Sequence, residues 1–118
     1  MSTENLPIFV KTYDFILWTM NHTAKFPKSA RFSLAVRIEN NLLEMLRAVM
    51  AANRLRDKAA MLEQADRHLE HARILMRMSK DLRYLNISSY EHAALSMDEI
   101  GRMLGGWLKQ QKAAGGRG

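Results

Sequence analysis

The stretch Asp98-Glu-Ile-Gly-Arg-Met-Leu-Gly-Gly-Trp-Leu-Lys109 combines a helical pattern of apolar residues with the first glycines of the chain. All six glycines lie beyond residue 100, and the only two prolines are Pro7 and Pro27. Gly and Pro cost about 1 and 3 kcal/mol relative to Ala inside a helix, so their absence from most of the chain favours helix. The sequence therefore predicts an all-α fold.

Two of these glycines, Gly101 and Gly105, lie one helical turn apart. Glycine at both positions removes side chains from one face of the helix, so that another backbone can approach closely. We expect this face to pack against a second copy of the chain.

Composition indicates a single globular domain. The chain has 118 residues, of which 47% are apolar and 25% charged, and it lacks cysteine, which excludes disulfides and thiolate metal sites. The N-terminus lacks the basic start and apolar run of a signal peptide, and no apolar run approaches the roughly 20 residues of a membrane span. We expect a cytoplasmic protein without a membrane partner.

The chain is strongly basic. Lys and Arg total 18 against 12 Asp and Glu, which gives a net charge of +6. Such an excess favours polyanionic partners, RNA or DNA above all, although many basic proteins bind no nucleic acid.

Apolar periodicity and the positions of the prolines predict an antiparallel up-down-up-down four-helix bundle over residues 1–112. The expected helices cover about residues 7–21, 28–53, 57–82 and 88–111, and residues 113–118 form a disordered tail. Asp57 is the expected N-cap of the third helix, and Ser88 with Glu91 has capping-box spacing at the fourth. The first helix carries Phe9, Tyr13, Ile16, Leu17 and Met20 at three- and four-residue spacing. The apolar residues expected on the other helices are Leu34, Ile38, Leu42, Met45, Leu46 and Val49 on the second, Leu62, Leu69, Ala72, Leu75, Met76 and Leu82 on the third, and Met97, Ile100, Leu104, Trp107 and Leu108 on the fourth.

Apolar residues exceed what one bundle core can cover. The third helix carries Ile74-Leu-Met76, then Met78 and Leu82, and the first carries Phe15-Ile-Leu-Trp18, so apolar side chains surround both helices. Soluble monomers seldom expose such patches, which favours a homo-oligomer; a wide core with some exposed apolar residues is the alternative. The expected interface residues are Phe15, Trp18, Ile74, Met78, Gly101 and Gly105.

Basic residues form three clusters. Arg73, Arg77 and Lys80 recur at i, i+4 and i+7 on the third helix, where arginine suits forked contacts with phosphate or carboxylate. The other clusters lie at the entrance to the second helix and at the turn before the third, and consist of Lys25, Lys28, Arg31, Arg54 and Arg56. We expect them to bind nucleic acid or a protein partner; a solvated charged face is the alternative for each.

No motif indicates catalysis. His68 and His71 could share a helix face, but no Glu-x-x-His pair accompanies them, and neither a nucleophile elbow nor a phosphate-binding glycine loop is present. We expect no enzymatic activity, no cofactor and no metal site.

Two segments resemble one family. His22-Thr-Ala-Lys-Phe-Pro-Lys-Ser-Ala-Arg-Phe-Ser-Leu34, followed by Arg37-Ile-Glu39, resembles the entrance of the second helix in accessory variability determinant proteins of diversity-generating retroelements. The Asp98–Lys109 stretch also resembles that family, which belongs to a wider group that includes proteins encoded in intervening sequences of large ribosomal RNA genes.

The resemblance implies a homopentamer of four-helix protomers with a basic surface. Such proteins associate with the retroelement's reverse transcriptase and with nucleic acid, and they support mutagenic copying of template RNA into cDNA. The resemblance also implies partner binding by Arg73 and Arg77, which match an Arg-x-x-x-Arg pair on the family's third helix. A free-standing structural oligomer with no specific nucleic-acid partner is the alternative function.

Overall fold

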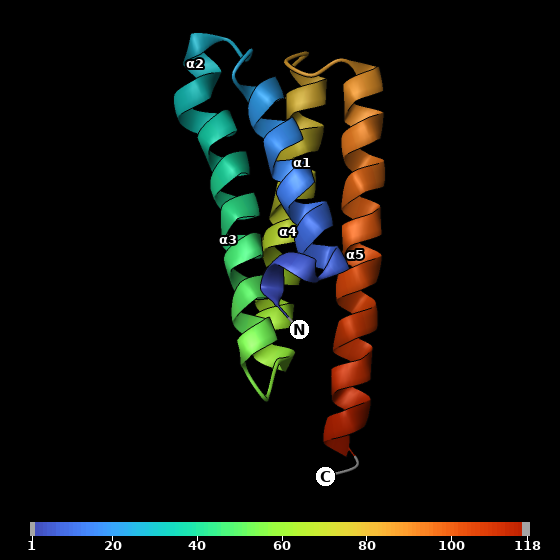
Figure 1. Cartoon of the computed structure of the whole chain (residues 1–118). Coiled ribbons are helices and arrows are strands. Elements are labelled where there is room, and N and C mark those ends of the chain that lie inside the picture. Colours follow the sequence, from blue (N-terminus) through green and yellow to red (C-terminus); the bar gives the residue numbers. More distant parts are fainter. Residues whose placement is uncertain (1, 117–118) are drawn as a thin grey trace.

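The computed structural model describes residues 2–116, which form an all-helical bundle without strands (Figure 1). Its elements are η1 (Thr3–Asn5), α1 (Pro7–Thr23), α2 (Lys28–Ala30), the π-helical turn η2 (Arg31–Ala35), α3 (Val36–Arg54), α4 (Ala59–Asp81) and α5 (Ile87–Gly116). Because α2, η2 and α3 follow one another without a gap, the chain makes four long helical segments. The prediction of an all-α four-helix bundle is confirmed.

Each long segment in Figure 1 returns along the one before it, so the molecule is an elongated body of 51 × 21 × 21 Å. Side-chain contacts show which parts of the chain meet at each end of the bundle. The rings of Phe26 and Tyr84 lie 5.6 Å apart between centroids, which places the α1–α2 and α4–α5 connections at one end of the bundle. Toward the other end, Lys112 on α5 forms a 3.4 Å ion pair with Glu63 on α4.

The core follows the predicted stripes on three of the four segments. Buried apolar side chains come from α3, α4 and α5, and include Ile38, Leu42, Met45, Val49, Leu62, Leu69, Met76, Met97, Ile100 and Leu104. Trp107 and Leu108 pack against this core while partly exposed. Leu82, which was expected in the stripe, is 53% exposed at the end of α4.

On α1, the apolar residues at helical spacing are only in part the buried ones. Tyr13 and Leu17 are 47% and 49% exposed, whereas the buried residues of α1 are Ile8, Thr12, Phe15, Ile16, Thr19 and Thr23. Three of these are threonines. Because threonine is not counted as apolar, the spacing of apolar residues in the sequence does not reveal the buried face of α1. Of the three, Thr23 has a partner, since its hydroxyl donates to a carboxylate oxygen of Glu39 on α3 at 2.5 Å. The buried hydroxyls of Thr12 and Thr19 have no hydrogen-bond partner among the described residues.

The second helical segment has nearly the predicted bounds but an unexpected interior. After Pro27, one turn of α-helix gives way to the π-helical η2 before α3 begins. A π-turn adds one residue to the hydrogen-bonded ring and thereby changes which side chains face the core. Leu34 and Ala35 are buried, whereas Phe32 is 81% exposed.

The predicted caps of the last two helices are displaced. Helix α4 begins at Ala59 with Lys58 at the N-cap, although the carboxylate of Asp57 accepts a 3.4 Å hydrogen bond from the Ala59 amide. Helix α5 begins before Ser88, and the Asn86 side-chain oxygen accepts a 2.8 Å bond from the Ser89 amide. Asn86 therefore caps α5, because it is as good an N-cap as Ser and occurs two residues earlier.

Helix α5 also extends beyond its predicted end. It continues to Gly116, beyond the predicted end near residue 111, while residues 117 and 118 of the predicted tail lie outside the described part. Ala113 and Ala114 favour helix, and the Lys112–Glu63 ion pair holds the preceding turn. Within residues 2–116, no helix is long and apolar enough to cross a membrane.

Candidate partner and nucleic-acid interface

Arg73 of α4 is bound by the neighbouring helix. One guanidinium nitrogen donates to the Asp98 carboxylate at 2.5 Å, and another donates to the main-chain oxygen of Met97 at 3.1 Å. Gly101 makes room for this arrangement, because a Cβ there would lie 2.7 Å from Nη2 of Arg73. The glycine predicted to admit a second copy therefore admits an arginine of its own chain.

The other two members of the predicted α4 stripe have different surroundings. Lys80 forms a 3.3 Å ion pair with Asp81, and its Nζ lies 4.9 Å from the centroid of the Tyr90 ring. Arg77 is exposed and has no ion pair or side-chain hydrogen bond among the described residues. Of the three predicted contacts, Arg77 alone therefore presents an uncompensated charge.

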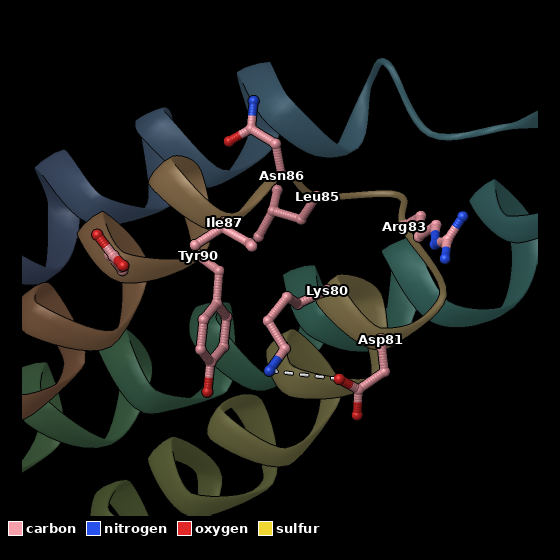
Figure 2. A pocket seen from close by; sticks show the side chains of 8 residues that line it. Lys80, Asp81, Arg83, Leu85, Asn86, Ile87 and Tyr90 are labelled. Carbon is pink, nitrogen blue, oxygen red and sulfur yellow. Dashed lines mark ion pairs between the residues drawn. The ribbon is translucent and has the colours of Figure 1, made fainter.

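An open pocket of about 820 Å³ lies where α4 turns into α5 (Figure 2). Its lining consists of Lys80, Asp81, Arg83, Leu85, Asn86, Ile87, Tyr90 and Glu91. Figure 2 shows the Lys80–Asp81 pair beside the Tyr90 ring, with Arg83 on the turn. The lining mixes acids and bases in equal number, so its charge selects no particular ligand.

Arg83 in this turn was not predicted as a site residue. It has a φ of 67°, and its amide bonds the Lys80 oxygen while the Tyr84 amide bonds the Ser79 oxygen, at 2.9 Å each. These two bonds form a Schellman motif, whose left-handed position glycine usually occupies. The sequence shows a basic residue just after the end of the third predicted helix, which could have suggested a site residue. It does not show that this residue adopts a left-handed backbone conformation.

The remaining predicted clusters lie at opposite ends of the bundle. Lys25, Lys28 and Arg31 are exposed around the α1–α2 connection, near the α4–α5 turn that Tyr84 joins to Phe26. Arg54, the last residue of α3, and Arg56, in the α3–α4 connection, are both exposed at the far end of an α3 helix that spans about 28 Å. The structure therefore does not bring the predicted basic residues together into one surface.

The predicted interface residues also divide. Ile74 and Met78 are 53% and 46% exposed, as an unpartnered apolar face requires. Phe15 is 4% exposed and belongs to the core, which contradicts its assignment to an interface. It immediately precedes Ile16, and both residues lie on the buried face of α1. Trp18 is partly buried and stacks on the ring of His22 at 3.9 Å.

The second predicted glycine behaves differently from the first. A Cβ on Gly105 would meet no atom within 4 Å, so this position is open on the monomer. Its assignment to an interface stays a prediction.

The two histidines of α4 contact each other, and His68 also contacts α3. The His68 ring donates from Nδ1 to the Asn41 side-chain oxygen on α3 at 3.0 Å, and burial lowers the pKa of His68 despite the opposing charge of Glu44. The His71 ring is edge-on to it at 6.5 Å. Across the described residues, no group of three or more His, Cys, Asp or Glu side chains could hold a metal ion.

Comparison with known proteins shows the family. Residues 7–111, nearly the whole chain, match the family described as bAvd-like, and no curated protein matches. This agrees with the resemblance in the second-helix entrance and in the Asp98–Lys109 stretch. It indicates an accessory protein of the accessory variability determinant type rather than a member of a known enzyme class. The chain belongs to the bAvd-like family.

Proposed function

We propose that the chain is a non-enzymatic, oligomeric, basic scaffold that binds a retroelement reverse transcriptase together with nucleic acid. In this role it supports mutagenic copying of template RNA into cDNA in the cytoplasm. Membership in the bAvd-like family supports the accessory role. The antiparallel order of the helices supplies a rigid body on which separate surfaces serve the two partners.

One observation carries the binding function: much of the positive charge is exposed and uncompensated. Among the described residues, no ion pair involves the exposed side chains of Lys25, Lys28, Arg31, Arg54, Arg56 and Arg77. Charges that the fold leaves unpaired remain available to phosphates or to acidic side chains of a partner.

Exposed apolar side chains support self-association. On α4, Ile74, Met78 and Leu82 recur every four residues and are 46–53% exposed. On α1, Val10, Tyr13 and Leu17 are 43–49% exposed. Two such stripes on one small protein favour a closed homo-oligomer, which we take to be the pentamer of the related accessory proteins.

Co-purification with a retroelement reverse transcriptase tests the partner assignment. We expect the wild-type chain to retain the enzyme, and Arg77→Ala to weaken retention. Arg67→Ala is the matched control, because Arg67 is also an exposed arginine of α4. Equal retention by the two variants would remove Arg77 from the site. A wild-type chain that retains no enzyme and binds neither RNA nor DNA would contradict the proposed function.

A further inference from the structure

Residues 25–37, here called the Phe32 segment, carry positive charge that nothing nearby compensates. The basic side chains in it are Lys25, Lys28, Arg31 and Arg37. The sequence contains no acidic residue between Asp14 and Glu39, and Glu39 accepts a hydrogen bond from Thr23 in the α1–α3 contact. Within residues 2–116, none of the four basic side chains has an ion pair. The segment therefore presents a local field of one sign.

Phe32 projects from the middle of this field. Its side chain is 81% exposed, more than any other large apolar residue of the described chain. The nearby residues Leu34 and Ala35 are buried and attach the segment to the core, whereas the Phe32 ring stays in contact with solvent. Phe32 lies in the π-helical turn η2, and π-turns frequently occur at functional sites.

Two cations flank the ring along the helix. Lys28 lies four residues before Phe32, about one turn away, and Arg31 immediately precedes it. The Nε of Arg31 donates to the main-chain oxygen of Phe26 at 3.0 Å. This bond restrains the guanidinium group through Nε and leaves the two terminal nitrogens, Nη1 and Nη2, available to a ligand.

We propose that the Phe32 segment binds single-stranded nucleic acid, with a base stacked on Phe32 and the flanking phosphates on Lys28, Arg31 and Arg37. Aromatic rings set among cations are the recurrent means of holding single strands, because every base has a face that can stack. A duplex keeps its bases stacked on one another and offers no such face. A second copy of the chain is the less suitable occupant, because self-association is assigned to the exposed apolar stripes of α1 and α4, whereas the Phe32 ring stands among cations that have no ion pair within the described chain.

This inference rests on the nucleic-acid part of the proposed function. The test measures fluorescence anisotropy of a labelled oligothymidylate and a labelled oligouridylate of about 20 nucleotides, and of a duplex of similar length. We expect Phe32→Ala to weaken single-strand binding by about 5- to 100-fold and to leave duplex binding unchanged. Phe32→Trp should retain the wild-type affinity, because indole also stacks.

Leu95→Ala is the matched control. Leu95 is 70% exposed on α5, and its neighbours in the sequence include Glu91 and Asp98 rather than cations. We expect this variant to bind every probe as the wild type does. The variants replace exposed side chains, so both should unfold at the wild-type temperature.

The outcomes separate the two levels of the proposal. If the wild type binds no probe, the nucleic-acid function fails and the inference fails with it. If the wild type binds but Phe32→Ala and Leu95→Ala have equal affinity, the inference alone fails. A change in oligomer mass for Phe32→Ala, measured by sedimentation, with unchanged oligonucleotide affinity would assign Phe32 to a contact between copies and also overturn it.

Discussion

The α4 stripe and the Phe32 segment are both basic clusters at helical spacing, but the fold compensates them differently. In the α4 stripe, Arg73 is paired with Asp98 and Lys80 with Asp81. In the Phe32 segment, no cation is paired among the described residues. Asp98 lies 25 residues from Arg73 in the chain, so only the packing of α5 on α4 reveals the difference.

This comparison gives the two clusters different roles. Arg73 joins α4 to α5, and Gly101 provides the space that this contact requires. Arg77 and the Phe32 segment remain available for partners. A cluster of cations is thus left available to a partner only where neighbouring helices supply no carboxylate.

The largest expected effect comes from removing the unpaired charges. The triple variant Lys28→Gln, Arg31→Gln, Arg37→Gln should lose about 100-fold in single-strand affinity near 0.1 M salt. Each phosphate contact contributes about 0.7 to the slope of log K against log salt, so the slope should fall by about 2. Salt titrations of oligothymidylate binding measure both quantities.

A control variant removes the same number of charges from paired positions. Lys11, Arg47 and Lys112 form ion pairs with Glu99, Glu44 and Glu63. Changing all three to Gln should alter the salt slope far less than the variant of the Phe32 segment. Equal losses in the two triple variants would mean that net charge, rather than its location, governs binding.

The second effect concerns the stability of the α4–α5 contact. Arg73→Ala should lower the free energy of unfolding by about 1 kcal/mol, because it removes two hydrogen bonds but the ion pair is partly exposed. Arg77→Ala should change it by less than about 0.5 kcal/mol. Urea denaturation at one fixed protein concentration compares them.

A charge exchange decides whether Arg73 acts through Asp98. The double variant Arg73→Asp, Asp98→Arg keeps an ion pair between α4 and α5 but reverses its direction. We expect the double variant to recover much of the stability and reverse-transcriptase retention that Arg73→Asp alone loses. If retention stays lost while stability recovers, Arg73 contacts the partner directly, as the family resemblance implies.

The third effect compares the two glycines of α5. Gly105→Ala should raise the free energy of unfolding by about 0.5 to 1 kcal/mol, because the position is open and Ala favours helix. Gly101→Ala should give no gain, because its Cβ displaces the Arg73 guanidinium from Asp98. Equal stabilisation in thermal or urea unfolding would show that the Arg73 contact contributes nothing.

The smallest effect is a pH dependence confined to the α3–α4 contact. Burial lowers the pKa of His68 below its ordinary 6.5, so the unfolded chain takes up this proton more readily than the folded one. Stability should therefore fall as pH drops below about 6.5.

His68→Gln removes this titration and should flatten the fall in stability between pH 7.5 and 5.5. Unfolding temperatures of the two proteins across that range provide the measurement. Identical pH profiles would show that the burial of His68 has no energetic consequence.

Particular residues show how far the sequence could predict this molecule. The absence of glycine from the first hundred residues and the apolar stripe of α3 were enough to predict the fold class and most of the core residues. In the core, burial follows the apolar periodicity of the helices. The core face of α1 was missed because Thr12 and Thr19 are buried. The π-helical turn that contains Phe32 was not predicted, because a π-turn has no distinct sequence signal.

The candidate site was less accessible from sequence than the fold. The basic clusters were visible, and so was the long stretch without acids before Glu39. The pairing of Arg73 with Asp98 depends on the register between α4 and α5, and the role of Gly101 depends on which way that arginine points. Neither can be derived from spacing within one helix.

Photo-crosslinking to an oligonucleotide that contains 5-iodouracil tests most directly which basic region holds the nucleic acid. Mass spectrometry after trypsin digestion identifies the attached peptide. We expect attachment within the tryptic peptide Phe32-Ser-Leu-Ala-Val-Arg37, at Phe32. Attachment at Tyr90 beside Lys80, with Phe32 unmodified, would place the strand at the α4–α5 turn and overturn the assignment of the strand to the Phe32 segment.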